Sequence, residues 1–183
     1  LPSVIIFNRF LTMTGADGIF TPMVSLRHGL VADMVDEKIN SARKDQFLQD
    51  IISSVWYTGK KYNIEEVHCA VIEKLSLSIF DQTVKLHRLG ERERFYLQIA
   101  SILHDVGKYV NSNFHDIHSY NIIRSQGIMG LSDQELNLVA NLARYHSEEI
   151  PSRSDDNYIE LNEKDRIIVA KLSCILKLAE SLD

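Results

Sequence analysis

The feature that most limits the fold of this chain is a long stretch without proline, between Pro22 and Pro151. From Asp36 onward, the stretch shows no sustained alternation of apolar and polar residues, which half-buried strands would require. Its apolar residues recur at spacings of three and four, the period of a helix with one buried face. We therefore expect residues 34–183 to form an all-α bundle.

Individual helices can be located within this region. We predict helices over residues 44–57, 63–87, 91–110, 116–125, 132–146 and 162–183. Helix starts are marked by Asn63 with Glu66, by Ser132 with Glu135, and by Asn162, which are capping patterns. The segment 91–110 is apolar nearly all round, which is typical of a central buried helix. Residues 148–161 are polar, contain Pro151 and are predicted to form a loop.

Residues 1–33 have a different pattern. Ser3 is placed to cap a helix that stops at Gly15, and short extended segments are predicted at 19–21 and 23–24. Two short strands cannot form a stable sheet alone. We therefore interpret residues 1–33 as the tail of an α/β domain that lies upstream, with a domain boundary near residue 33.

Composition excludes several classes of protein. The chain has 183 residues, 45% of them hydrophobic, and a net charge of -5, so it is neither disordered nor typical of a duplex nucleic-acid binder. The sequence shows no signal peptide and no apolar stretch near the ~20 residues needed to span a membrane. Cys69 and Cys174 stand alone in apolar stretches, so we expect reduced core thiols and a cytoplasmic location.

Ionisable side chains interrupt the apolar faces of the predicted helices. His68, the pair His104-Asp105, His146 and Glu180 all fall on inward positions, and His118 lies on a short helix nearby. A single buried histidine is more often bonded to a backbone carbonyl than to a metal. Several such residues on separate helices of one bundle favour a divalent metal as their common partner. Imidazole and carboxylate ligands without a thiolate favour Zn²⁺, Mn²⁺ or Fe.

The segment His104-Asp105-Val106-Gly107-Lys108, with a histidine 36 positions earlier and another 14 later, resembles the H…HD…H…H…D pattern of the HD-domain metal-dependent phosphohydrolases. The whole chain is similar to the C-terminal part of the exopolyphosphatase and guanosine pentaphosphate phosphatase (Ppx/GppA) family. The stretches that carry this resemblance are VSLRHGL at 24–30, LHDVGKYV at 103–110, HDIHSYNII at 115–123, GLSDQE at 130–135, ARYHSEEIP at 143–151 and KLAESLD at 177–183. It implies an HD-type helical bundle, preceded by the remnant of an actin-like domain of the sugar kinase type.

The resemblance also implies a ligand set for one or two ions of Mn, Zn, Fe or Mg. His68, His104 and Asp105 match the core ligands, and His118 and His146 match ligands of two-metal members. Glu180 stands where the family pattern has aspartate, and Asp183 is the alternative ligand.

Further roles follow from the same resemblance. Asp105 would bridge the metals and orient the nucleophile, and Lys108 would neutralise substrate phosphate, although a solvated surface lysine explains Lys108 equally well. Arg144 and Lys171 are weaker candidates for substrate binding. His115 and Asp116 are interpreted as partners that orient His118, although a short, solvent-exposed helix start explains them equally well.

The function predicted on this basis is hydrolysis of a phosphate ester or anhydride, with a phosphorylated small molecule or polyphosphate as partner. The alternative is a module without catalysis that binds polyphosphate or (p)ppGpp for a catalytic domain upstream. A helical dimerisation domain is a third possibility, because helix bundles often form homodimers.

Overall fold

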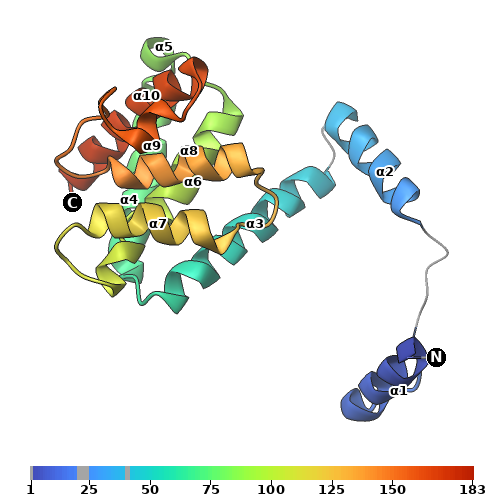
Figure 1. Cartoon of the computed structure of the whole chain (residues 1–183). Coiled ribbons are helices and arrows are strands. Elements are labelled where there is room, and N and C mark those ends of the chain that lie inside the picture. The colour runs from blue at the N-terminus through green and yellow to red at the C-terminus, as the bar shows by residue number, and fades with distance from the viewer. Residues whose placement is uncertain (1, 20–24, 40–41) are drawn as a thin grey trace. The chain divides into compact units, whose positions relative to one another are not determined.

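A computed structural model describes residues 2–19, 25–39 and 42–183, and these contain ten α-helices, one short 3₁₀ helix and no strand (Figure 1). The chain divides into two compact units, Leu1–Asp45 and Gln46–Asp183. The helices are α1 (Pro2–Thr14), α2 (Leu26–Ile39), α3 (Ala42–Lys61), α4 (Glu66–Gln82), α5 (Val84–His87), α6 (Glu91–Leu103), η1 (Val106–Tyr109), α7 (His115–Gln126), α8 (Asp133–Arg144), α9 (Asp156–Ile159) and α10 (Glu163–Glu180). The predicted all-α class is confirmed for these ranges.

The first unit is helical where the structure describes it, and the predicted α/β remnant is not seen there. Helix α1 stops at Gly15, whose φ of 65° is the left-handed stop predicted from the sequence. Ser3 lies inside α1, so the predicted cap at Ser3 is wrong. Ile19 belongs to no strand, and the rest of the two predicted strands, residues 20–24, lies outside the described residues. Helix α2 was not predicted and runs through residue 33, where the domain boundary remains a prediction.

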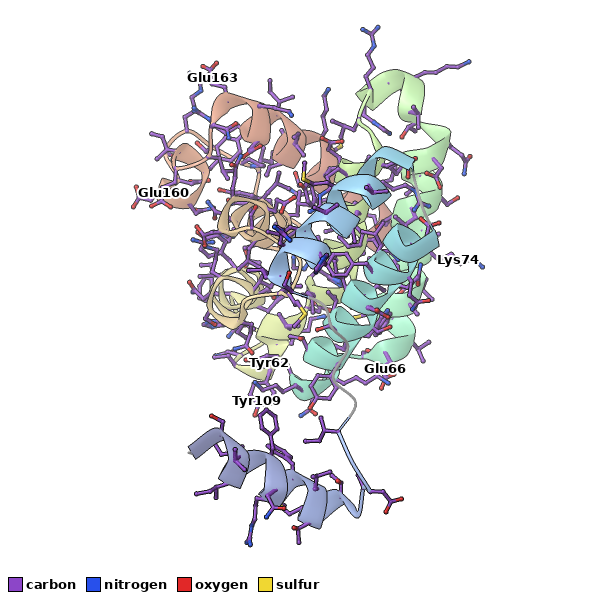
Figure 2. The ribbon with its side chains drawn as sticks, turned by 90° about the vertical axis from the view of Figure 1, so that its right-hand side faces the viewer. Tyr62, Glu66, Lys74, Tyr109, Glu160 and Glu163 are labelled. Carbon is purple, nitrogen blue, oxygen red and sulfur yellow. The ribbon has the colours of Figure 1, made fainter. Side chains whose placement is uncertain are left out.

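The second unit is built around α6. Leu97, Ile99, Ala100 and Ile102 of this helix are completely buried. Helix α6 packs against α4, α8 and α10, and α7 packs against α8 and η1. Charged side chains of α4, such as Glu66 and Lys74, point away from the bundle (Figure 2). The prediction that α6 is the central buried helix is confirmed.

Several helix ends differ from the predictions. The helix predicted over 91–110 ends at Leu103, and the chain continues through a turn into η1. The helix predicted to open at Asn63 begins at Glu66, because Asn63 has a left-handed φ of 52° and lies in the turn that follows α3. The capping box of Ser132 and Glu135 is confirmed, as is the cap of α10 by Asn162.

Some predicted faces are shifted. The buried residues of α4 are Cys69, Ile72, Ser76 and Phe80, so His68 lies beside the buried face and not in its centre. Cys69 is buried as predicted, whereas Cys174 of α10 is exposed and is not a core thiol.

Among the helices that the structure describes, none has the length and apolar character needed to cross a membrane.

Candidate metal centre

The pair His104-Asp105 lies in the turn between α6 and η1, where the chain leaves the core. A hydroxyl of α7 holds this turn: Ser119 Oγ donates to the His104 carbonyl at 2.5 Å and accepts from the Gly107 amide at 2.8 Å. Ser119 is fully buried. The turn is therefore fixed against α7, and both side chains of the pair project into the interior with 0% and 5% of their side-chain area exposed.

A first ligand group combines His68 of α4, His104, Asp105 and Glu180 of α10. The two imidazoles bring their Nε2 atoms to 3.2 Å from one another. Asp105 Oδ2 lies 3.6 Å from His68 Nε2 and 3.4 Å from His104 Nε2. Glu180 spans the same two rings, with Oε1 3.5 Å from His68 Nε2 and Oε2 3.3 Å from His104 Nε2. Four side chains from three segments, namely α4, the turn before η1 and α10, thus face one small volume.

A second ligand group combines Asp105, His115 of α7 and His146, which follows α8. Its two imidazoles also bring their Nε2 atoms to 3.2 Å from one another. The other carboxylate oxygen of Asp105, Oδ1, lies 3.6 Å from His115 Nε2 and 3.7 Å from His146 Nε2. Asp105 is therefore shared, with Oδ2 in the first group and Oδ1 in the second.

Each of the four histidines is oriented by a hydrogen bond from its other ring nitrogen. Nδ1 of His104 donates to the Ser101 carbonyl at 2.8 Å, Nδ1 of His146 to the Ala143 carbonyl at 2.7 Å, and Nδ1 of His115 to the Ser112 carbonyl at 3.0 Å. Nδ1 of His68 donates to Asp183 Oδ2 at 2.7 Å. Carbonyl and carboxylate oxygens only accept, so Nδ1 carries a proton in each ring, and Nε2 faces inward, where it can ligate a cation when the ring is neutral.

The spacing of the donor atoms fits metal ligation. Zn–N bonds of about 2.0–2.1 Å in a tetrahedron place neighbouring ligand atoms about 3.4 Å apart. The separations that involve an imidazole nitrogen are 3.2–3.7 Å in both groups. Buried oxygens Asp105 Oδ1 and Glu180 Oε2 also find no hydrogen-bond donor among the described residues. Because unpaired buried polar groups are costly, the inward-facing Nε2 atoms and the unpartnered carboxylate oxygens together fit a bound cation.

The electrostatics of the site keep its carboxylates ionised. Burial alone would raise the pKa of Asp105, but the adjacent imidazoles of His104 and His146 outweigh burial and hold this pKa well below its usual range. The pKa of Glu180 is also lowered, since His104 more than offsets the effect of burial. Both carboxylates are thus available as anionic ligands at neutral pH.

Metal binding should release a proton from this site. Burial acts to lower the pKa of His104, but Asp105 and Glu180 outweigh it and raise the pKa to about 9. His104 is therefore protonated below about pH 9, whereas a histidine that ligates a metal must be neutral. Metal binding near pH 7 should therefore release about one proton from His104. For the same reason, metal affinity should fall roughly tenfold for each pH unit of acidification. Calorimetric titration of Zn²⁺ in two buffers of different ionisation enthalpy measures this release. Binding heats that are independent of the buffer would contradict the prediction.

The other predicted site residues are placed as follows. His118 belongs to neither ligand group, and the position expected for it is taken by His115, one turn earlier on α7. Asp183 contacts the far nitrogen of His68 and not the shared volume. Lys108 binds Asp105 Oδ2 through its ammonium group, which is half exposed at the edge of the site. The ammonium of Lys171 donates to the His87 carbonyl at 2.8 Å, and its role in substrate binding stays a prediction.

Two functional residues were missed or misjudged from the sequence. His115 was interpreted as a partner of His118, but its Nε2 faces His146 and Asp105 directly. Ser119, which holds the His104-Asp105 turn, was not considered. It stands four residues after His115, and this helical spacing is the one signal that could have placed both side chains on the same face.

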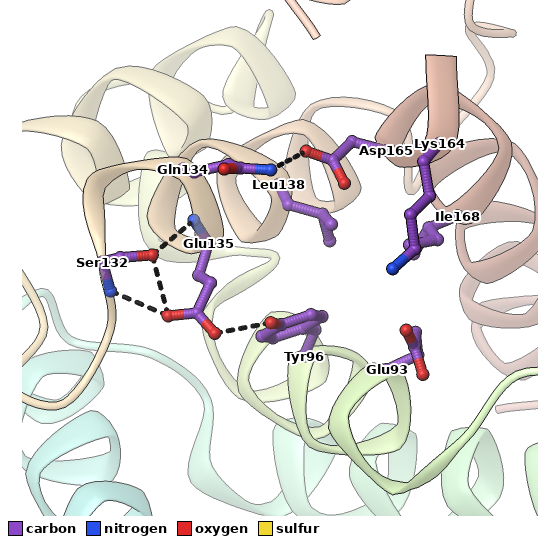
Figure 3. Close-up of a pocket in the computed structure, with 9 residues that line it drawn as sticks. All are labelled: Glu93, Tyr96, Ser132, Gln134, Glu135, Leu138, Lys164, Asp165 and Ile168. Carbon is purple, nitrogen blue, oxygen red and sulfur yellow. Dashed lines mark hydrogen bonds between the residues drawn. The ribbon is translucent and has the colours of Figure 1, made fainter. Parts of the chain in front are cut away.

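A pocket of about 270 Å³ between α6, α8 and α10 contains none of these ligands (Figure 3). Several of its polar groups bind one another: Glu135 accepts from the Ser132 amide at 2.8 Å and from the Tyr96 hydroxyl at 2.6 Å. Gln134 donates to Asp165 at 2.8 Å. One side of the pocket therefore consists of a helix cap and its neighbours, whose polar groups already have hydrogen-bond partners.

The chain is similar to a known protein family. The sequence model of a family described as Ppx/GppA phosphatase, domain III, matches residues 52–183, which include every residue of both ligand groups. A search of curated proteins gave no match.

Proposed function

Because the chain belongs to the Ppx/GppA phosphatase family through its domain III, we propose that residues 46–183 form a metal-dependent phosphohydrolase domain with a dinuclear centre. The observation that carries this proposal is the position of Asp105, whose two oxygens face two separate sets of imidazoles. A carboxylate shared in this way is suited to bridging a pair of ions.

The two ligand groups and Asp105 would take different parts in hydrolysis. Divalent cations held by these ligands would supply a nucleophile from water near neutral pH and would neutralise phosphoryl oxygens. The first group offers four ligand residues and the second offers three, so the second group is the one that would admit water and substrate. Asp105, which faces both groups, would orient the attacking water.

Lys108 is the basic side chain that we assign to the substrate. Its ammonium group contacts Asp105 Oδ2, and 49% of its side-chain area is exposed. Because the stem is flexible, the ammonium can turn from the carboxylate toward a phosphate oxygen that enters the site. The substrate class that fits these groups is a phosphate ester or anhydride, including polyphosphate.

Metal loading combined with hydrolysis assays tests the proposal. The purified chain is analysed for bound metal, loaded with Mn²⁺ or Zn²⁺, and assayed on phosphodiesters, nucleotides and polyphosphate, with His104→Ala as the matched variant. We expect hydrolysis that depends on the metal and is lost in His104→Ala. A chain that takes up no metal would refute the proposal.

A different result would favour the alternative function. If metal binds but no substrate is hydrolysed, the chain is a binding module of the family and not a hydrolase. Salt-sensitive binding of polyphosphate would then support a regulatory role, because contacts between phosphate and basic side chains are screened by salt.

Asp183 should strengthen metal binding without being a ligand. Its Oδ2 accepts from His68 Nδ1 at 2.7 Å, which orients the ring and makes Nε2 more basic. Loss of such a partner typically weakens metal affinity about 10–100-fold, so we expect about tenfold for Asp183→Asn and more for Asp183→Ala. Competition with a coloured chelator measures the affinity. Ser181→Ala, which removes a hydrogen bond to the Lys177 carbonyl nearby, is the control, and an equal loss in this variant would contradict the assignment.

A further inference from the structure

Arg144 connects the two segments that carry the second ligand group. It is the last residue of α8, two positions before His146, and its guanidinium group donates to Asp116, the residue that follows His115. The same guanidinium donates to Glu149, in the segment that follows His146. Arg144 itself precedes His146, and its guanidinium group contacts one residue next to His115 and another that follows His146.

This ion pair is enclosed by the protein. Only 13% of the Arg144 side chain and 9% of the Asp116 side chain are exposed, so the two charges are shielded from competing water. A guanidinium group is planar and presents two donor edges, which lets it hold two carboxylates at fixed angles. Because both charges are largely desolvated, the contact has one strongly preferred geometry, and Arg144 is not a free cation for binding phosphate.

A second ion pair joins α7 and α8 at the ends of the two helices that lie away from the ligand groups. Arg124, in the last turn of α7, donates to Asp133, in the first turn of α8, at 3.0 Å. The Asp133 side chain is 86% exposed. Helices α7 and α8 therefore carry one ion pair near the ligands, at the start of α7 and the end of α8, and another at the opposite ends of both helices.

We propose that Arg144 is a positioning residue that assembles the second half of the metal centre, through the Asp116 carboxylate. The pair fixes the start of α7 against the end of α8, and so keeps the Nε2 atoms of His115 and His146 at the 3.2 Å separation that one ion requires. This inference rests on the proposed dinuclear centre. It assigns Arg144 to metal loading and not to substrate.

Titration with Mn²⁺, followed by electron paramagnetic resonance, separates the two halves of the centre. Wild-type protein should bind two ions and show the signal of an exchange-coupled pair. In the double variant Arg144→Gln/Asp116→Asn, which leaves no unpaired charge between these two residues, the second ion should bind about 10–100-fold more weakly, while the first ion binds as before. The coupled signal should then give way to that of an isolated ion.

Two further variants define the outcome. Arg124→Gln breaks the other ion pair between α7 and α8 and should retain both ions with wild-type affinity. Arg144→Lys keeps the charge but not the planar fork, and should recover part of the second-site affinity. If the double variant is poorly folded, the same comparison is made between Arg144→Lys and wild type.

The result for wild-type protein distinguishes the two proposals. Wild-type protein that binds no Mn²⁺ refutes the proposed function and this inference with it. If wild-type protein binds two ions, and a folded Arg144 variant does so with unchanged affinity, the inference alone is overturned.

Discussion

Asp105→Asn is expected to empty both halves of the metal centre at once. Asp105 is the one residue shared by the two ligand groups, with Oδ2 facing His68 and His104 and Oδ1 facing the second pair of imidazoles. An amide has nearly the same shape, but it carries no charge and its nitrogen cannot ligate a cation. We therefore expect metal affinity to fall more than about 100-fold, which exceeds the loss typical of residues that only orient a ligand. Elemental analysis after dialysis against Mn²⁺ measures the loss.

The control for this variant is another buried aspartate. Asp165 of α10 is 5% exposed and accepts hydrogen bonds from Gln134 and Asn162, both at 2.8 Å. Asp165→Asn removes a buried carboxylate of the same unit, so it reproduces any general effect on folding. It should bind metal as wild type does. If Asp105→Asn keeps one ion with wild-type affinity, the carboxylate is not shared, and the two groups act independently.

The helical framework was largely predictable because helix periodicity is a local signal. The burial of Leu97, Ile99 and Ile102 follows from their spacing in a segment that is apolar nearly all round. The end of α6 was not predictable in this way. Val106 resumes the apolar pattern after His104 and Asp105, so the sequence contains no clear stop after Leu103. The break there depends on the contact of Ser119 with the turn, which joins residues far apart in sequence.

The candidate site was predicted in part. His68, His104, Asp105, His146 and Glu180 were selected from the sequence, and the structure brings all five into the two ligand groups. The choice between His115 and His118 could not be made correctly, because both lie on α7 one turn apart. Which ring reaches the interior depends on how the first turn of α7 lies against the end of α8, and that arrangement is set by packing.

Gly107→Ala is expected to be among the most damaging single substitutions in the helical unit. A Cβ at this position would lie 1.9 Å from the His115 carbonyl oxygen and 2.5 Å from the Ser119 amide nitrogen. Both atoms are backbone, so relief requires η1 and α7 to move apart. Overpacking of this kind costs about 3 kcal/mol, which would lower the melting temperature by roughly 10 °C. The same movement separates His115 from the turn that carries His104 and Asp105, so metal affinity should fall together with stability.

Gly59 provides a matched comparison for Gly107, because it is also buried but meets a side chain. A Cβ at Gly59 would lie 2.3 Å from Ile64 Cδ1, the far end of a flexible group that can turn away. Gly59→Ala gains helix propensity in α3, which offsets part of the repacking, so its melting temperature should stay within about 3 °C of wild type. Thermal unfolding of both variants with and without Mn²⁺ separates packing from ligation. If Gly107→Ala matches Gly59→Ala in both stability and metal uptake, η1 and α7 are not held in close contact, and the glycine after His104-Asp105 has no role in bringing His115 to the metal.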